Sequence, residues 1–285
     1  MKNILITGAN GQLGNEMRVL SAEHPEYTYF FTDVAELDIC NEQAIQDFVK
    51  ASAIHVIVNC AAYTAVDNAE DNIGLCTKLN ADAVGYLAEA AEANGAEFIQ
   101  ISTDYVFDGT AHTPYRETEP TCPNSVYGHT KLMGEQNALT LCTRSMVIRT
   151  AWLYSTFGNN FVKTMIRLGR ERDSLGVIFD QVGTPTYARD LARAILAAIR
   201  QGVTPGIYHF SNECVSSWYD FTKAIHRLAG ITTCQVKPLH TSEYPTKAKR
   251  PHYSVLDKTK IKEVYHVEIP YWEASLKECI SKLIF

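Results

Sequence analysis

The stretch N-I-L-I-T-G-A-N-G-Q-L-G, residues 3–14, decides the fold. A short apolar run enters a turn in which Gly8, Gly11 and Gly14 form the pattern G-x-x-G-x-x-G between a predicted strand and a predicted helix. Glycines there let the backbone turn sharply and approach a pyrophosphate, and the helix N-terminus supplies N–H donors. A tight turn without a ligand is the alternative. The position directly after the first strand favours a dinucleotide site.

Acidic residues follow the next predicted strand, residues 27–32. Asp33 stands about 20 positions after the glycines, where a carboxylate binds the adenosine ribose. Such a carboxylate accepts a hydrogen bond from the 2′-OH of NAD and repels a 2′-phosphate, so charge alone favours NADH. Asp38 either flanks the adenine or caps the helix that begins near Asn41, and the sequence leaves both interpretations open.

Strands and helices alternate through the first half of the chain. This alternation predicts a parallel sheet with right-handed crossovers, a Rossmann-type doubly wound α/β fold, over residues 1–150. We expect an Ala-rich helix over residues 67–94, stopped by Asn94-Gly95. Further strands are predicted at residues 54–59, 97–102 and 144–149.

The second half, residues 151–285, is less regular. We expect it to be mainly a smaller, interleaved α/β substrate-binding domain, with a segment at about 180–210 returning to the first domain. Helices are predicted at residues 157–170, before Gly202, at 217–229 and from near Tyr271, and a strand at 206–211.

Composition limits the function classes. Hydrophobic residues make up 46% of the 285 positions and charged residues 20%, which is typical of a globular protein. A net charge of −6 without a Lys/Arg block argues against a nucleic-acid or membrane partner. The N-terminus has no secretory pattern, and eight scattered cysteines lack metal spacing, so we expect a cytoplasmic protein with reduced thiols, mostly in the core.

The stretch S-V-Y-G-H-T-K-L-M-G-E, residues 125–135, carries the candidate chemistry. Its i,i+4 spacing places Tyr127 and Lys131 on one face of a predicted helix, where an ammonium would lower the pKa of the phenol. An ordinary amphipathic helix is the alternative. The preceding strand ends in S-T-D-Y-V-F-D-G, so Thr103 is predicted at the same sheet edge as the glycine turn.

These three elements together resemble the extended short-chain dehydrogenase/reductase superfamily. The resemblance implies that a carbonyl accepts hydride from the nicotinamide. It also implies that Thr103 bonds the carbonyl oxygen and that Tyr127 is the general acid. Lys131 would lower the pKa of Tyr127 and hold the nicotinamide ribose.

Longer blocks resemble the dTDP-4-dehydrorhamnose reductase family, among them N-C-A-A-Y-T-A-V-D-N-A-E, R-T-A-W-L-Y, G-N-N-F-V-K-T-M, D-Q-V-G-T-P-T and R-P-H-Y-S-V-L-D. The family implies NAD(P)H-dependent reduction of the 4-keto group of dTDP-4-dehydro-L-rhamnose, for surface polysaccharide. Alternatives are reduction or epimerisation of another nucleotide sugar, or a non-catalytic regulatory subunit. Cys60 departs from the family's common alanine. The implied cofactor contacts are Gly11, Gln12, Leu13, Asp33, Asp38, Ile39, Ala62, Tyr63, Thr64, Tyr127 and Lys131, and the implied sugar contacts are Thr103, Asp104 and Trp152.

Other candidates stay between two interpretations. Trp152 either stacks on the sugar or belongs to the core, and Asn160, with Asn159, either contacts substrate or caps a helix. Arg250 either binds the diphosphate or lies in a solvated basic loop. Some family members are described with Mg²⁺, but no ligand spacing places it, and we interpret Glu16 and Asp190 as surface charges near helix starts. A homodimer is compatible with the resemblance.

Overall fold

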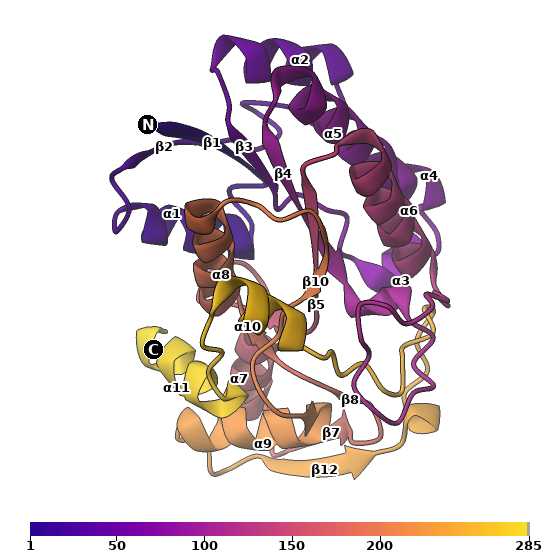
Figure 1. The fold of residues 1–285 in the computed structure, drawn as a ribbon. Coiled ribbons are helices and arrows are strands. Elements are labelled where there is room, and N and C mark those ends of the chain that lie inside the picture. Colours follow the sequence, from indigo (N-terminus) through magenta and orange to yellow (C-terminus); the bar gives the residue numbers. More distant parts are fainter. Residues whose placement is uncertain (284–285) are drawn as a thin grey trace.

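The computed structural model describes residues 1–283, and its centre is a six-stranded parallel sheet in the order β10-β5-β4-β3-β1-β2 (Figure 1). Every residue of β3 and β5 is buried, as expected for parallel strands covered on both faces. The predicted α/β class is confirmed. The strands are β1 (Lys2–Thr7), β2 (Tyr27–Phe31), β3 (Val56–Asn59), β4 (Glu97–Thr103), β5 (Ser145–Thr150) and β10 (Gly206–His209).

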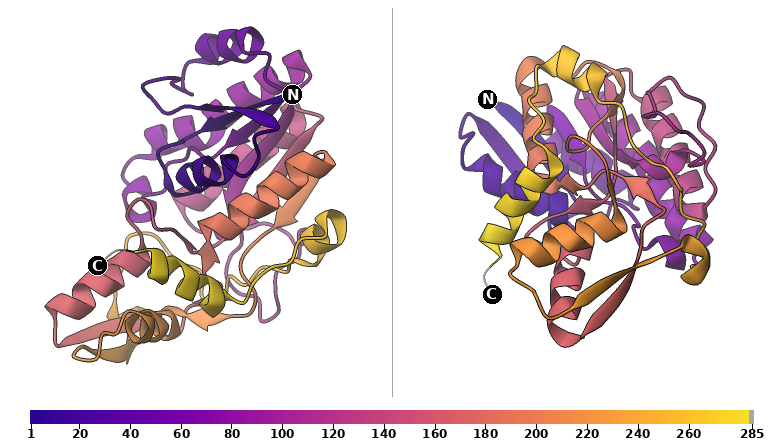
Figure 2. Two further views of the ribbon diagram at one scale, coloured as in Figure 1. Left: turned by 90° about the vertical axis from the view of Figure 1, so that its left-hand side faces the viewer. Right: turned by 90° about the horizontal axis from the view of Figure 1, so that it is seen from below.

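Helices cover both faces of this sheet (Figures 1 and 2). One face packs against α1 (Gln12–Ser21), α8 (Ala188–Gln201) and α10 (Thr259–Tyr265). The other face packs against α2 (Glu42–Ala51), α5 (Ala83–Asn94) and α6 (Val126–Leu141). Each set shares an apolar core with the strands, and this burial of aliphatic side chains stabilises the layered arrangement.

A smaller unit lies at one end of the sheet and has a core of its own (Figure 2). Strands β7 and β12 pair in parallel, and the aromatic rings of Phe221 and Trp272 pack beneath them. Segment 188–209, which forms α8 and β10, joins the main sheet. The elements of the smaller unit are α7 (Phe161–Glu171), β7 (Ser174–Ile178), α9 (Trp218–Leu228), β12 (Gln235–Leu239) and α11 (Trp272–Lys282).

Short elements connect the two parts. Two-residue strands pair as β6 with β9 and as β8 with β11. Two 3-10 turns, η2 and η3, follow β4 and β12. Their bounds are β6 (Leu153–Tyr154), β8 (Val182–Gly183), β9 (Thr186–Tyr187), β11 (Ser216–Ser217), η2 (Asp104–Val106) and η3 (Thr241–Glu243).

The predicted continuous helix over residues 67–94 is wrong. The chain forms α3 (Val66–Ala69), α4 (Ile73–Thr77) and the π-helix η1 (Lys78–Asp82) before α5 begins. The side chain of Asn80 explains the widened turn, because it hydrogen-bonds the main chain of Tyr63 and the hydroxyl of Thr130. The predicted stop is confirmed, since Gly95 ends α5 in the left-handed region.

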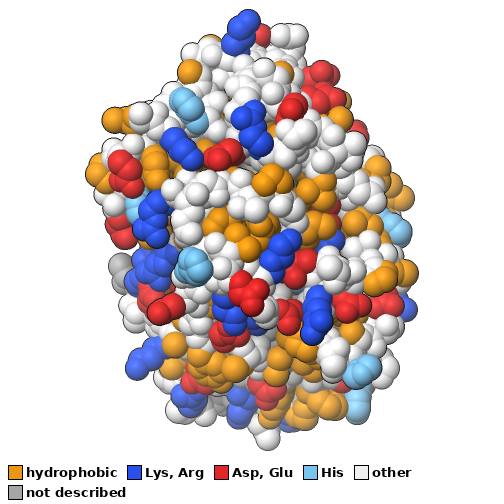
Figure 3. All heavy atoms as spheres, viewed as in Figure 1, with side chains coloured by type: hydrophobic (Ala, Val, Ile, Leu, Met, Phe, Trp, Pro, Cys, Tyr) orange, Lys and Arg blue, Asp and Glu red, His pale blue; other side chains and the backbone are white. Residues whose placement is uncertain are grey.

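The surface shows no charge segregation on the face drawn in Figure 3, where acidic and basic side chains are interspersed. Within residues 1–283, no helix has the length and apolar character that a bilayer crossing needs.

Helix α6 approaches its neighbours closely because two of its residues lack a side chain. A Cβ on Gly128 would lie 2.3 Å from the carbonyl oxygen of Tyr105, and one on Gly134 would lie 2.1 Å from that of Asn80. Both distances are shorter than any van der Waals contact, so only glycine fits at these positions. The two glycines bracket Lys131 and let α6 approach the main chain of η2 at Tyr105 and of η1 at Asn80.

We expect Gly134→Ala to lower the free energy of unfolding by about 2 kcal/mol, because the new methyl group overpacks against backbone. Gly85→Ala, in α5, is the matched control, since its Cβ would meet only side-chain atoms of Leu141 and Asn137, at 3.5 Å or more. There the better helix propensity of alanine stabilises by about 0.5 to 1 kcal/mol. Urea unfolding of both variants tests this, and equal stabilities would contradict the close approach.

Candidate active site

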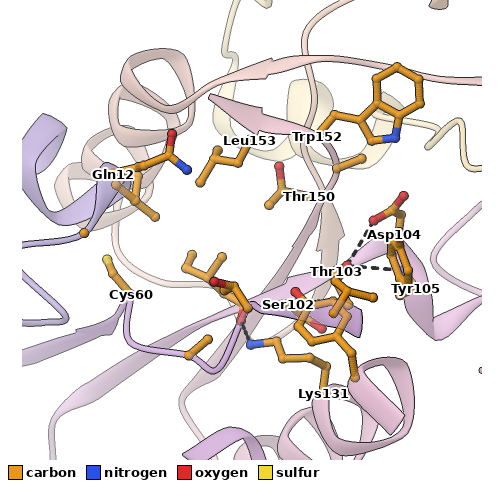
Figure 4. Close-up of a pocket in the computed structure, with 18 of the residues that line it drawn as sticks. Gln12, Cys60, Ser102, Thr103, Asp104, Tyr105, Lys131, Thr150, Trp152 and Leu153 are labelled. Carbon is orange, nitrogen blue, oxygen red and sulfur yellow. Dashed lines mark hydrogen bonds between the residues drawn. The ribbon is translucent and has the colours of Figure 1, made fainter. Parts of the chain in front are cut away.

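A cavity of about 530 Å³ opens at the carboxyl edge of the sheet (Figure 4). Strand order changes direction between β1 and β3, and loops that leave adjacent strands in opposite directions make a crevice there. The turn after β1, the ends of β3, β4 and β5, and α6 contribute to the lining. The smaller unit adds residues 158–160 from the segment before α7.

The structure brings Thr103, Tyr127 and Lys131 together in this cavity. Ser125 caps α6 by accepting a hydrogen bond from the Gly128 N–H, so the helix begins just before Tyr127. The Lys131 ammonium donates to the carbonyl oxygen of Ile101 at 2.6 Å. The predicted helical face is therefore present and points at the end of β4.

The ionisation of the pair differs from the prediction. Burial raises the pKa of Tyr127 above its usual value, and this effect outweighs the hydrogen bond with Thr103, which lowers it. Burial also lowers the pKa of Lys131 to about 8. The expected net lowering of the Tyr127 pKa by the ammonium is wrong, because loss of hydration at this depth is the larger effect. Tyr127 is a neutral phenol at neutral pH.

The glycine turn forms a cradle with no room for side chains. Gly8 has φ +60°, and a Cβ there would lie 2.6 Å from the Ala61 nitrogen, while one on Gly14 would lie 2.5 Å from the Cα of Ala9. Gly11 precedes α1 without any side-chain cap. Gln12 and Leu13 line the main cavity beside it. A bare turn at a helix N-terminus fits a dinucleotide pyrophosphate.

A second cavity, of about 270 Å³, continues from this turn and includes Asp33, Asp38 and Ile39 in its lining. The Asp33 carboxylate accepts the Asn10 and Val34 N–H groups, at 3.1 and 2.9 Å. The alternative helix-capping role for Asp38 is wrong, because Asn41 caps α2 and Asp38 accepts instead from the Cys40 N–H. The space suits the adenosine half of a dinucleotide.

Three consecutive residues after β3 differ in their placement. Ala62 and Thr64 line the main cavity, whereas Tyr63 lines neither of the two cavities. Asn80 holds the main chain of Tyr63 through both its N–H and its carbonyl oxygen. A role for Tyr63 in binding the cofactor thus finds no support in this geometry.

Asp104 is buried beside Thr103, whose hydroxyl donates to its Oδ1 at 3.0 Å. Among the described residues, Oδ2 has no hydrogen-bond partner. Burial raises the pKa of this carboxyl from 3.8 to about 6, against the effects of the Ser254 and Thr103 side chains, which lower it. At neutral pH the group is therefore a carboxylate in the wall of the cavity.

Trp152 is half-buried and lines the cavity with its backbone in the left-handed region, at φ 49°. Its ring stacks on that of Trp218, with centroids 3.5 Å apart and planes at 9°. A Cβ on Gly183 would lie 2.7 Å from the Trp152 ring, so this residue leaves space for the stack. Trp152 thus joins the core of the smaller unit and still reaches the cavity.

The remaining substrate candidates have other partners. Asn160 caps α7 by accepting from the Lys163 N–H, and its amide group also donates to Gln12 at 3.0 Å. The capping interpretation is confirmed, and the residue lines the cavity as well. Arg250 lines neither cavity and pairs with Asp67 at 2.7 Å, while it also donates to the Tyr105 hydroxyl.

The interpretation of Glu16 and Asp190 as surface charges is wrong. Both are buried, and Glu16 accepts from the Ser155 hydroxyl at 2.6 Å and from Arg189 at 2.8 Å. Asp190 accepts from Asn212 and other polar groups. Both oxygens of Glu16 are occupied by these donors, and the described residues contain no group of three His, Cys, Asp or Glu side chains that could hold a metal.

Several lining residues were not identified from the sequence. Pairing of Thr103 with Thr150 across β4 and β5 could have indicated Thr150, because neighbouring parallel strands end together. Gly158 comes from the smaller unit, and no local signal predicts its approach to Gln12. The lining residues missed are Cys60, Ala61, Val66, Ile101, Ser102, Tyr105, Thr150, Ala151, Leu153 and Gly158.

The doubly wound sheet, its glycine cradle and the Thr, Tyr and Lys groups in one cavity define an extended short-chain dehydrogenase/reductase. A family model described as the RmlD substrate binding domain matches residues 1–285. The dTDP-4-dehydrorhamnose reductase of Aggregatibacter actinomycetemcomitans is 41% identical over an alignment 287 residues long, and this alignment covers 97% of this chain and 98% of that one.

Two solved structures agree with this match. The dTDP-4-dehydrorhamnose reductase of Clostridium acetobutylicum is 46% identical with a TM-score of 0.94, covering 99% of each chain. That of Bacillus anthracis, in complex with NADP, is 38% identical with a TM-score of 0.94, covering 99% of this chain and 100% of that one. The chain belongs to the dTDP-4-dehydrorhamnose reductase family.

We expect Asp104→Asn to change how stability depends on pH. Since folding raises the pKa of this carboxyl from 3.8 to about 6, its contribution to stability is complete below pH 3.8 and is lost as the pH rises through 6. The asparagine variant avoids this loss. The free energy of unfolding of the variant, relative to that of the unaltered protein, should therefore be about 2 to 3 kcal/mol higher at pH 7 than at pH 4.

Urea unfolding at both pH values measures this difference. Asp108→Asn is the control, because hydrogen bonds from Thr110 lower the pKa of Asp108 and the sign should be opposite. A stability difference between Asp104→Asn and the unaltered protein that does not change with pH would contradict the raised pKa.

Proposed function

We propose that this protein reduces the 4-keto group of dTDP-4-dehydro-L-rhamnose to give dTDP-L-rhamnose, with NADPH or NADH as the reductant. One observation carries the proposal, namely that Thr103, Tyr127 and Lys131 line the same cavity as the glycine turn after β1. The named relatives support the choice of sugar. The product would serve surface polysaccharide synthesis, in the cytoplasm.

The protonation states suit reduction. A reduced nicotinamide supplies hydride to the carbonyl carbon when it is bound. Tyr127 then donates its phenolic proton to the developing alkoxide, and burial keeps that proton in place at neutral pH. The Lys131 ammonium, charged below pH 8, stabilises the phenolate that remains. Thr103 bonds the carbonyl oxygen and orients it towards Tyr127.

Cofactor and sugar would occupy different parts of the site. Gly8, Gly11 and the N-terminus of α1 would hold the pyrophosphate, and Lys131 the nicotinamide ribose. Asp104, which lines the cavity, would accept a sugar hydroxyl. Residues 1–150 with 188–209 would then form the cofactor domain, and most of 151–285 the substrate domain. Arg250 would reach the substrate diphosphate only by leaving Asp67.

A non-catalytic regulatory subunit is the alternative from a different class. The presence of all three polar groups argues against it, because a binding module has no use for a buried phenol beside a buried ammonium. Another nucleotide sugar as substrate is the alternative within the enzyme class. Incubation of the purified protein with reduced coenzyme and different nucleotide sugars separates these possibilities.

Tyr127→Phe should lose most turnover while it binds the coenzyme normally. The variant lacks only the proton donor, and loss of general acid catalysis lowers kcat by roughly 10² to 10⁴-fold. Coenzyme fluorescence measures binding, and absorbance at the coenzyme's near-ultraviolet band measures turnover. Tyr86→Phe is the control for a lost phenol, because Tyr86 lies in α5, which contributes no residue to the lining of this cavity. Near-normal turnover of Tyr127→Phe would remove this residue from the mechanism.

Coenzyme preference should respond to Asp33. We propose that both coenzymes are used and that the Asp33 carboxylate disfavours the 2′-phosphate of NADPH by charge repulsion. Asp33→Asn keeps an acceptor for the Asn10 N–H and removes the charge. The ratio of kcat/KM for NADPH to that for NADH should rise by about tenfold, which corresponds to about 1.4 kcal/mol. An unchanged ratio would show that Asp33 does not select the coenzyme.

A further inference from the structure

A buried ion pair lies one helical turn beyond Lys131. Glu135 accepts from the Arg149 Nε at 2.9 Å and from its Nη2 at 2.7 Å, a bidentate arrangement. Its Oε1 also accepts from the Ser102 hydroxyl at 2.5 Å. Glu135 and Arg149 are each 2% exposed. Both oxygens of this carboxylate are therefore fixed by charged or polar donors, away from water.

The arginine has no other counter-ion among its described contacts. Its guanidinium lies over the Phe107 ring, and its Nη1 is 3.5 Å from His209 Nε2. Burial lowers the pKa of His209 to about 3, so this imidazole is neutral. A buried ion pair is weak evidence for stability, because desolvation offsets the Coulomb attraction. Its position relative to the reacting groups points to another role.

Helix α6 aligns this pair with those groups. Tyr127, Lys131 and Glu135 are spaced by four residues and share one helical face. Two consecutive residues of β4 contact this face, because the Ile101 carbonyl accepts a hydrogen bond from Lys131 and the Ser102 hydroxyl donates one to Glu135. Thr103 follows at the cavity. Two hydrogen bonds, one buried and one partly buried, thus fix α6 against β4 next to the phenol and the threonine.

Few charged groups face the Lys131 ammonium. Glu135 on its own helix raises the pKa of Lys131 against the effect of burial, and Cys76 on α4 acts in the same direction. Tyr127 is neutral at neutral pH. Asp104, beyond Tyr127, acts on the phenol and has no resolved effect on Lys131. Glu135 is therefore the main anion that favours the charged form of Lys131.

We propose that Glu135 is a positioning residue for the reaction, because its carboxylate fixes α6 on β4 through Ser102 and on β5 through Arg149, and keeps Lys131 charged and in place. This inference rests on the carbonyl reduction proposed above. It assigns Arg149 the role of holding that carboxylate, and it gives Glu135 no contact with substrate.

The test is the pH dependence of coenzyme binding by Glu135→Gln, measured through the fluorescence of NADPH without any sugar. Binding by the unaltered protein should weaken as the pH rises through 8, where Lys131 loses its proton. Glutamine has nearly the same shape as glutamate, but it leaves Lys131 and Arg149 without the carboxylate. The midpoint should move to lower pH by about one unit, and kcat at pH 8 should fall by roughly fivefold, because the charged fraction of Lys131 there falls from about one half to about one tenth.

Two further variants isolate the charge. Glu135→Gln with Arg149→Met removes both members of the pair, and its midpoint should lie between those of the single variant and the unaltered protein. Glu89→Gln, on the exposed face of α5, controls for the loss of a carboxylate and should leave the midpoint unchanged. A purely structural role for Glu135 would lower the yield or stability of folded protein without moving the midpoint.

The outcomes are distinct. An unshifted midpoint in Glu135→Gln overturns the positioning role, whatever the sugar substrate proves to be. If that variant is insoluble, the double variant decides, and a midpoint equal to that of the unaltered protein overturns the role. A shifted midpoint in a protein that does not oxidise NADPH with dTDP-4-dehydro-L-rhamnose supports the positioning role and rejects only the proposed substrate.

Discussion

The close packing of α6 on the end of β4 is the constraint on which the site depends. Gly128 lets the helix approach the Tyr105 carbonyl just beyond β4, Gly134 lets it approach η1 at Asn80, and the Lys131 ammonium reaches the Ile101 carbonyl at 2.6 Å. This contact places a cation in a region that excludes water. The chemistry of the site depends on this burial, because burial shifts the pKa values of Tyr127 and Lys131 and so sets their protonation states.

Much of the fold could be predicted because its signals are local. The glycine turn, the alternating strands and the helix stop at Gly95 are all encoded within a few residues. The helix over residues 67–94 was misjudged because its interruption depends on Asn80, which bonds groups at Tyr63 and Thr130 that are far away in the chain. Periodicity within one segment contains no information about such partners.

The site, like the fold, has features that local sequence predicts and features that depend on distant contacts. Thr103, Tyr127 and Lys131 could be placed at one edge because parallel strands all end there. The protonation state of Tyr127 could not be inferred, because a neighbour at i+4 is visible in the sequence and the degree of burial is not. Glu16 was misjudged for a related reason. Its partners, Ser155 and Arg189, come from parts of the chain more than 130 residues away. The position of Glu16 near a helix start therefore does not reveal that its carboxylate is buried.

The smaller unit completes the cavity through contacts that also hold its own core together. Trp152 stacks on Trp218 within that core, and Asn160 caps α7 while its amide group donates to Gln12 beside the glycine turn. Any displacement of α7 relative to the sheet would therefore move a cavity residue and strain a helix cap together. Because the cofactor cradle and the smaller unit share this hydrogen bond, the position of Gln12 depends on the position of the segment that precedes α7.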